Sequence, residues 1–188
     1  VPDTDTIKKY IDREHPRHAV VVGGGFIGLE MAENLHDQGL DIAVVEMANQ
    51  VMAPLDYSMA AIVHQQLIEK KVDLRLEDGV LRFEETDGGI IVHLKSGKQI
   101  PTDLVILSIG VRPETKLAKE AGLAIGVLGG IAVNDYMQTS DPDIYALGDA
   151  VEVLNPVTGK PALIPLAGPA NKQGRIVADN IVFGNRET

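Results

Sequence analysis

The sequence predicts an α/β protein built around a parallel central sheet. Within Arg17–Glu46, an apolar run, a glycine-rich turn, a helical pattern and a second apolar run follow one another. Residues 80–100 then change to alternating and β-branched segments separated by Asp-Gly-Gly and Ser-Gly turns, which predict a three-stranded antiparallel meander. Together these observations predict a Rossmann-like, three-layer first domain in which the meander replaces a crossover helix.

The turn Gly23–Gly28 reads GGGFIG and has the spacing of a dinucleotide-binding loop. Gly23 permits a tight turn, Gly25 lets the backbone approach a pyrophosphate, and Gly28 lets the helix lie close to the strand. The helix N-terminus offers unpaired N–H groups to the phosphates. Glu46, which ends the second apolar run, can accept hydrogen bonds from ribose hydroxyls. A glycine-rich turn of another α/β protein is the alternative, but strand, helix and acid together favour dinucleotide binding.

Glu46 also favours NAD(H) over NADP(H). NADP(H) needs a cation beside its 2′-phosphate, whereas a carboxylate repels that phosphate. The sequence has no Lys or Arg between Glu46 and Lys70. We therefore expect NADH to be the bound nucleotide.

The composition excludes several classes of partner. The 188 residues are 45% hydrophobic and 23% charged, which is ordinary for a globular protein with a buried core. A net charge of −10 argues against nucleic acid and anionic membrane surfaces. The chain has no long apolar run and no leader pattern, so we expect no membrane partner and a cytoplasmic location.

Cysteine is absent, so this chain has no disulfide, no thiolate metal site and no cysteine nucleophile. The five histidines are scattered without the spacing of metal ligands. We expect them on the surface, and we expect no metal site.

The remaining elements of the first domain follow from the period of their apolar residues. Residues 1–16 form a lead-in, and the run at 104–109 predicts a central parallel strand that returns beside the first strand. The other expected elements are a lead-in helix at 4–13, a helix from about 57 to 70, a strand at 72–76 and meander strands at 80–85, 89–94 and 98–100.

The organisation changes after Gly110, where glycine-rich and turn-rich stretches become frequent. Pro169 suits the first turn of a last helix, which we expect at 170–183 with Gly184 ending it. The other expected elements are a short helix at 116–121, strands at 131–133 and 144–147, and an excursion loop at 156–165.

Four features in order carry a resemblance to a known family. They are VVGGGFIGLEMAENL with Glu46, the meander, SIGVRP at 108–113 and TSDPDIYALGDA at 139–150. The chain thereby resembles the pyridine nucleotide-disulfide oxidoreductases, FAD enzymes that are reduced by NAD(P)H. The tail PLAGPANKQGRIVADNI at 165–181 is similar to the subgroup of coenzyme A-disulfide reductases, NADH oxidases and peroxidases. The sequence of this tail favours a coenzyme A-disulfide or polysulfide reductase.

The resemblance implies a role for individual residues of the first domain. Glu46 would bind the adenosine ribose, and Val80 would form part of the wall beside the adenine. Gly110 would let the nucleotide approach the backbone. Glu30 would lie near the nicotinamide carboxamide. Plain strand packing at Val80 and a solvated helix position at Glu30 remain the alternatives. The residues implied around the NADH pyrophosphate are Gly23, Gly25, Phe26, Ile27 and Gly28.

The resemblance also implies contacts to FAD. Asp149 would bind the ribityl chain, and the N–H groups of Ala167 and Gly168 would meet the pyrimidine edge of the flavin. A turn cap is the alternative for Asp149. Arg112 could clamp an acid, but a solvated loop arginine is the simpler interpretation.

In the family, an FAD domain with its own glycine motif and the redox cysteine precedes the NAD domain. The resemblance therefore implies a fragment: an NAD(H)-binding domain at 17–111 and the C-terminal part of a split FAD-binding domain at 112–188. We expect no catalytic residue in this chain and no activity of the fragment alone. FAD would bind only together with the missing half. The parent would be a homodimer, and the fragment could self-associate through orphaned strands.

Two other functions stay open from the sequence. One is an NADH oxidase or peroxidase of the same family, and the other is a stand-alone NAD-binding or sensing module. A simple NAD dehydrogenase finds no support, because Tyr57, Tyr136 and Tyr145 lack the Tyr-x-x-x-Lys spacing.

Overall fold

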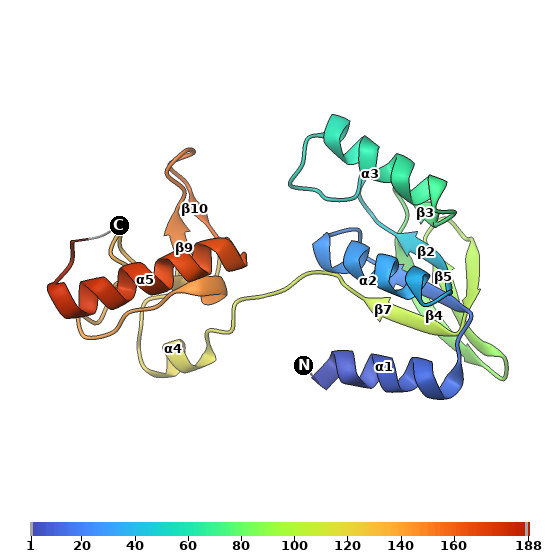
Figure 1. Ribbon diagram of the computed structural model, residues 1–188, viewed down its shortest axis with the longest axis horizontal. Coiled ribbons are helices and arrows are strands. Elements are labelled where there is room, and N and C mark those ends of the chain that lie inside the picture. The colour runs from blue at the N-terminus through green and yellow to red at the C-terminus, as the bar shows by residue number, and fades with distance from the viewer. Residues whose placement is uncertain (1, 187) are drawn as a thin grey trace. The chain divides into compact units, whose positions relative to one another are not determined.

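The computed structural model describes residues 2–186 and 188, and the chain forms two compact units, Val1–Gly110 and Val111–Thr188 (Figure 1). Each unit has its own sheet structure. Among the described residues, none of the helices combines the length and the apolar character needed to cross a bilayer. The same residues contain no cluster of three His, Cys, Asp or Glu side chains that could hold a metal ion.

The first unit is built on a four-stranded parallel sheet with the order β3-β2-β1-β7 (Figure 1). Its strands are β1 (His18–Val22), β2 (Asp41–Val45), β3 (Asp73–Arg75) and β7 (Leu104–Leu107). The returning strand does pair with β1, in the register Val20 to Val105. The expectation of a central position for it was wrong, because β7 is an edge strand of this sheet.

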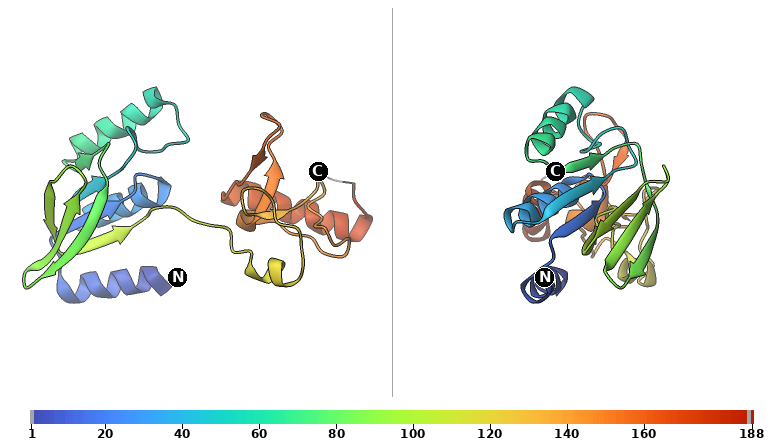
Figure 2. Two further views of the ribbon diagram at one scale, coloured as in Figure 1. Left: turned by 180° about the vertical axis from the view of Figure 1, so that it is seen from behind. Right: turned by 90° about the vertical axis from the view of Figure 1, so that its right-hand side faces the viewer.

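The parallel sheet is covered on both faces, which confirms the predicted three layers. Helices α1 (Pro2–Glu14), α2 (Phe26–Asp37) and α3 (Tyr57–Glu69) cover one face, and the meander of β4 (Val80–Thr86), β5 (Gly89–Leu94) and β6 (Gln99–Thr102) covers the other (Figure 2). Alternate residues of β1 serve the two layers. Val21 belongs to the same buried cluster as Leu35 of α2, whereas Val20 belongs to the same buried cluster as Val92 of the meander. Full burial of each such side chain contributes about 1.5–3 kcal/mol.

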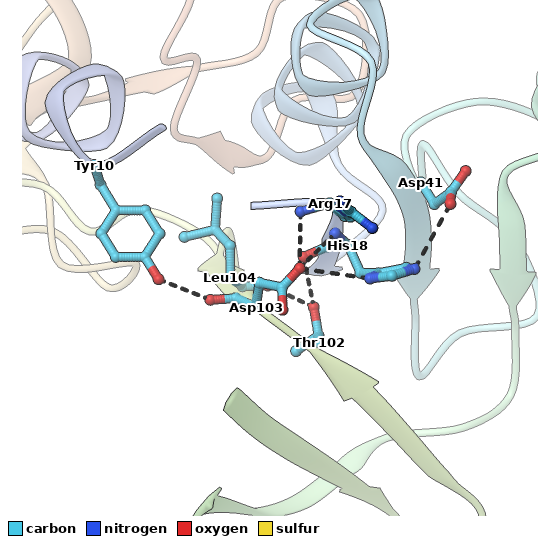
Figure 3. A network of polar contacts seen from close by, with 7 residues as sticks. All are labelled: Tyr10, Arg17, His18, Asp41, Thr102, Asp103 and Leu104. Atoms are coloured by element: carbon cyan, nitrogen blue, oxygen red, sulfur yellow. Dashed lines mark hydrogen bonds and ion pairs between the residues drawn. The ribbon is translucent and has the colours of Figure 1, made fainter. Parts of the chain in front are cut away.

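The lead-in helix begins at Pro2, earlier than the expected residue 4, and is fastened to the sheet by a polar network (Figure 3). The Tyr10 hydroxyl donates to the carbonyl oxygen of Asp103 at 3.0 Å. Asp103 Oδ2 accepts the backbone N–H groups of Arg17 at 2.8 Å and His18 at 2.9 Å. These two bonds, the Arg17 bond first, hold the pKa of the Asp103 carboxyl below its usual value. The network joins the starts of β1 and β7.

One histidine contradicts the expectation of surface positions. His64 of α3 is buried, and its Nε2 accepts the backbone N–H of Val51 at 3.1 Å. The ring of Tyr57 packs edge-on against it. His64 therefore satisfies a buried backbone donor of the loop before α3, which is a requirement that composition alone does not reveal.

The second unit combines short strands with two helices, α4 (Lys116–Glu120) and α5 (Ala167–Phe183). Strand β9 (Val151–Leu154) pairs with β8 (Ile131–Ala132) and with β10 (Pro161–Ala162). The expected strand at 144–147 was wrong. Those residues form one isolated bridge, Gln138 to Tyr145, because the chain turns at Gly148 with φ +79° before the real strand begins.

A buried carboxylate organises the glycine-rich loop of the second unit. Glu152 of β9 accepts the backbone N–H groups of Val127 at 3.0 Å and Leu128 at 2.7 Å. A Cβ atom at Gly126 would lie 2.2 Å from the carboxyl carbon of Glu152, so the loop needs glycine there. Two backbone donors and one buried charge thus satisfy one another.

Candidate nucleotide-binding site

A cavity of about 790 Å³ opens at the carboxyl ends of β1, β2 and β7 in the first unit. Ligands of open α/β sheets bind at this edge, and the volume suits a small-molecule ligand. Its walls come from the glycine turn, the residues after β2, the turn into β4 and the residues after β7. They include Val22, Gly23, Gly24, Gly25, Phe26, Glu46, Met47, Asp78, Gly79, Val80, Leu81, Phe83, Ser108 and Gly110.

The glycine turn is tight where it meets protein and open where a ligand would lie. Gly23 has φ +106°, and a Cβ atom there would lie 2.4 Å from the carbonyl oxygen of Ser108. A Cβ at Gly28 would lie 1.9 Å from the carbonyl oxygen of Gly23. No atom lies within 4 Å of the Cβ position of Gly25, which is exposed at the N-terminus of α2. The free space at Gly25 can therefore admit an anion to the helix N-terminus.

Glu46 follows β2 and is part of the same turn. Its Oε2 accepts the backbone N–H of Gly24 at 2.7 Å, and its Oε1 accepts the N–H of Ala48 at 2.8 Å. Each carboxylate oxygen has more than one acceptor site, so two bonds leave capacity for hydroxyl groups. The half-buried carboxylate is thus oriented by the backbone before any ligand arrives.

Two further side chains support the cavity walls, and neither was predicted from the sequence. Ser108 Oγ donates to the carbonyl oxygens of Val22 at 2.9 Å and Gly23 at 3.1 Å, which ties the end of β7 to the turn. Asp78 Oδ2 accepts the Ser96 hydroxyl at 2.5 Å, and this bond is the main reason why the pKa of Asp78 lies below its usual value. A small hydroxyl residue directly after an apolar strand was the available signal for Ser108.

The structure brings six of the nine predicted NADH residues to this cavity. They are Gly23, Gly25, Phe26, Glu46, Val80 and Gly110. Gly28 is buried in contact with Gly23 and Ser108, as close helix–strand packing requires. Ile27 and Glu30 do not line it, and they border a separate groove of about 380 Å³ between α1 and α2. The roles of Ile27 at the pyrophosphate and of Glu30 near the nicotinamide stay predictions.

The three predicted FAD residues lie in the second unit. Asp149 is in the short 3-10 helix η1 (Gly148–Ala150), and Ala167 and Gly168 are the first residues of α5. The N–H of Gly148 donates to Gln173 Oε1 of α5 at 2.8 Å, so η1 is held against that helix. All three predicted residues are exposed. Asp149 and the α5 N-terminus therefore belong to one packed substructure, and their roles toward FAD stay predictions.

Comparisons with known proteins agree with the predicted resemblance. The family model described as pyridine nucleotide-disulphide oxidoreductase matches residues 2–174. An NADH oxidase of Methanocaldococcus jannaschii is 42% identical over 96% of this chain and 40% of its own length. A CoA-dependent NAD(P)H sulfur oxidoreductase of Pyrococcus abyssi is 37% identical over the same shares. The chain thus spans about 40% of the length of the curated relatives it matches.

Solved structures extend the similarity to the fold. The reduced CoADR-RHD protein of Bacillus anthracis has 57% identity and a TM-score of 0.94, and the match covers 100% of this chain and 33% of that one. An FAD-dependent oxidoreductase of Desulfovibrio vulgaris has 40% identity and a TM-score of 0.86 over 100% and 48%. The water-forming NADH oxidase of Lactobacillus brevis bound to NADH has 34% identity and a TM-score of 0.84 over 93% and 39%. The cofactors of these two proteins are the two predicted from the sequence.

Proposed function

Because this chain belongs to the pyridine nucleotide-disulphide oxidoreductase family, we propose that its first unit binds NADH and presents it to a flavin for hydride transfer. Residues 17–111 form the proposed NAD(H)-binding domain, and residues 112–188 form the proposed C-terminal part of a split FAD-binding domain. The compact units divide the chain between Gly110 and Val111, one residue from this proposed boundary. Residues 2–16 are held to the first domain through Tyr10.

The observation that carries the proposal is that Gly25 and Glu46 border one cavity. Gly25 leaves the N-terminus of α2 open, and the partial positive charge there suits a pyrophosphate. Glu46 is held by Gly24, the residue before Gly25, so the ribose acceptor and the phosphate site keep a constant separation. Pre-positioning of this kind reduces the ordering cost of binding.

The apolar walls of the cavity suit the adenine ring. Val80, Leu81 and Phe83 of β4 line it, and Met47 faces it from the end of β2. The side chains of Met47, Leu81 and Phe83 are exposed in the free chain, so a bound ring would remove apolar surface from water. Glu46 repels a 2′-phosphate, and this supports NADH as the preferred nucleotide.

Residues of the second unit fit one edge of FAD. FAD, when bound, supplies the ring that accepts hydride from NADH. The carboxylate of Asp149 is exposed and makes no hydrogen bond within residues 2–186, so it is available to ribityl hydroxyls. Ala167 and Gly168 begin α5, where N–H groups have no acceptor inside the helix. The same helix end stabilises negative charge on a reduced ring.

We propose a coenzyme A disulfide or a polysulfide as the class of electron acceptor of the whole protein. The names of the relatives and the sequence of the tail at 165–181 support this choice. An NADH oxidase or peroxidase is the alternative within the family. Reduction of a disulfide needs a thiolate nucleophile. These 188 residues contain no cysteine, so they supply the reductant side of the reaction only.

Titration of the purified 188-residue chain with NADH, followed by calorimetry, tests the proposal. We expect one NADH per chain, and we expect no NADH oxidation above the buffer rate when FAD is added. Absence of NADH binding would overturn the proposed function. Sustained NADH oxidation by the chain would overturn only the proposal that these 188 residues bind NADH without oxidising it on their own.

A further inference from the structure

A lysine that is distant in sequence lies beside Met47, one of the residues that line the cavity. Met47 directly follows Glu46 and lines the cavity. Lys95, in the turn between β5 and β6, places its Nζ 3.8 Å from Met47 Sδ. The stretch between Glu46 and Lys70 lacks cations, but the meander brings one to the neighbour of Glu46 from 48 residues further along the chain.

Gly79 leaves the space in which these two side chains meet. The Lys95 N–H donates to the carbonyl oxygen of Gly79 at 2.7 Å. A Cβ atom at Gly79 would lie 3.0 Å from Met47 Cγ and 3.3 Å from Lys95 Cδ. Any larger residue there would push both side chains aside. The path of the Lys95 side chain toward Met47 therefore depends on the bare backbone of Gly79.

The turn that carries Lys95 is fastened to the cavity wall. Asp78 Oδ1 accepts the backbone N–H groups of Gly79 at 3.0 Å and Ser96 at 3.1 Å, and Oδ2 accepts the Ser96 hydroxyl at 2.5 Å. Asp78 itself lines the cavity. The backbone of Lys95 is thus held on both sides, through its own N–H and through Ser96, while its ammonium group stays exposed.

The Lys95 ammonium is available to a ligand. Within the described residues it forms no ion pair with a carboxylate, although Glu46 and Asp78 both belong to the same rim. Glu46 is already engaged by Gly24 and Ala48, and Asp78 by the Ser96 turn. This ammonium lies 3.8 Å from Met47 Sδ, and Met47 directly follows Glu46, the residue that would bind the adenosine ribose. The group that distinguishes NADPH from NADH is a phosphate on that ribose.

We propose that Lys95 is a specificity-determining residue that lets this cavity take NADPH as well as NADH, by pairing with the 2′-phosphate. The inference rests on the proposed nucleotide site. Glu46 opposes the phosphate and Lys95 attracts it, so NADH remains the tighter ligand and NADPH binding depends on Lys95. An exposed pair of this kind contributes up to about fivefold in affinity, and salt weakens it.

The test measures the dissociation constants of NADH and NADPH by calorimetry for four forms of the 188-residue chain. These are the unaltered chain, Lys95→Ala, Lys95→Arg and Lys98→Ala. We expect Lys95→Ala to raise the ratio of the NADPH constant to the NADH constant about threefold to fivefold. Lys95→Arg keeps the charge and should restore the ratio of the unaltered chain. Lys98→Ala removes an equal charge from the same turn and should change the ratio by less than half as much.

Three results would overturn the inference. They are an unchanged ratio in Lys95→Ala, an equal change in Lys98→Ala, and no NADPH binding by an unaltered chain that binds NADH. Absence of NADH binding by the unaltered chain would instead overturn the proposed function itself. A melting curve for each variant shows whether it folds, and the exposed position of Lys95 predicts unchanged melting.

Discussion

Glu46 Oε2 lies 2.7 Å from the backbone nitrogen of Gly24, and this hydrogen bond joins the end of β2 to the glycine turn after β1. The acid that the sequence assigns to a ribose is therefore also a support of the turn. Oε1 extends the support to Ala48. A substitution of Glu46 acts on two levels, because it removes a ligand acceptor and releases two backbone donors.

Replacement of Glu46 by Ala should weaken NADH binding by about 1–2 kcal/mol, because hydrogen bonds to a charged group are lost. The same change should lower the melting temperature, since the N–H groups of Gly24 and Ala48 lose their acceptor. Calorimetric titration and a melting curve give the two effects separately. Asp56→Ala is a matched control, because Asp56 is an exposed acid that precedes α3 and makes no side-chain cap bond to it. Unchanged NADH affinity in Glu46→Ala would contradict the ribose assignment.

Two glycines of the turn should respond in opposite ways to replacement by Ala. Gly23→Ala forces a side chain into φ +106° and within 2.4 Å of the Ser108 carbonyl, so it should destabilise the fold by about 1–3 kcal/mol. Gly25→Ala meets no atom within 4 Å and should leave stability within about 0.5 kcal/mol. Its methyl group would nevertheless occupy the open approach to the helix N-terminus.

Chemical denaturation and NADH titration of both variants check these outcomes. We expect Gly25→Ala to fold like the unaltered chain and to lose at least about tenfold in NADH affinity, because ligand and methyl group cannot share the space. Full NADH affinity in Gly25→Ala would place the pyrophosphate elsewhere. A Gly23→Ala chain of unchanged stability would show that the turn relaxes.

The Asp103 carboxylate should make the first unit sensitive to acid. Its pKa lies below the usual 3.8 because the N–H groups of Arg17 and His18 bind the charged form. A lowered folded-state pKa contributes stability that is present above 3.8 and is lost as the pH falls through the folded value. The side chain is 36% exposed, so solvent screening limits the contribution to about 1 kcal/mol.

Urea denaturation of Asp103→Asn and the unaltered chain at several pH values measures this contribution. The difference in unfolding free energy should be constant between pH 5 and 7, at about 1 kcal/mol, and should shrink below pH 3.8. Asp87→Asn, in the exposed β4–β5 turn, is the matched control. If the difference in unfolding free energy stays unchanged at the lowest pH, the effect of Asp103→Asn comes from altered packing or hydrogen bonding and not from the loss of the charge.

Glu152 offers a test of the second unit by itself. Glu152→Ala would leave the N–H groups of Val127 and Leu128 without an acceptor inside the fold, at a cost of about 2–4 kcal/mol. Glu152→Gln keeps the volume and one acceptor, and its cost should be smaller. Hydrogen exchange should show faster exchange at Val127 and Leu128 in both variants. Slow exchange there in Glu152→Ala would contradict the role of this carboxylate.

The first unit could be predicted well because its local signals are strong. The apolar run of β1 and the glycine turn depend on neighbours in sequence, and the meander turns carry their own glycines. The second unit was harder, because its strands are short and its backbone depends on partners far away. Strand β9 pairs with the short strands β8 and β10, and its Glu152 holds a loop 24 residues away, whereas the apolar run at 144–147 forms only a single bridge.

The candidate site shows the same division. The glycines and Glu46 were found because their spacing reflects a local turn. Asp78, Lys95 and Ser108 were not assigned, since each acts on a residue between 18 and 86 positions away, across strand and sheet pairings. Ile27, expected at the pyrophosphate, and Glu30, expected near the nicotinamide, came from the family resemblance, and the structure leaves both outside the cavity.

Hydrogen exchange of the 188-residue chain with and without saturating NADH tests directly whether the dinucleotide binds in this cavity. We expect slower amide exchange at the glycine turn 23–28, at 46–48 and at the cavity wall 78–83. We expect little change at Val127 and Leu128, which Glu152 holds in the second unit. Protection confined to the groove between α1 and α2, or no protection at the glycine turn, would contradict the assignment of this cavity to the dinucleotide.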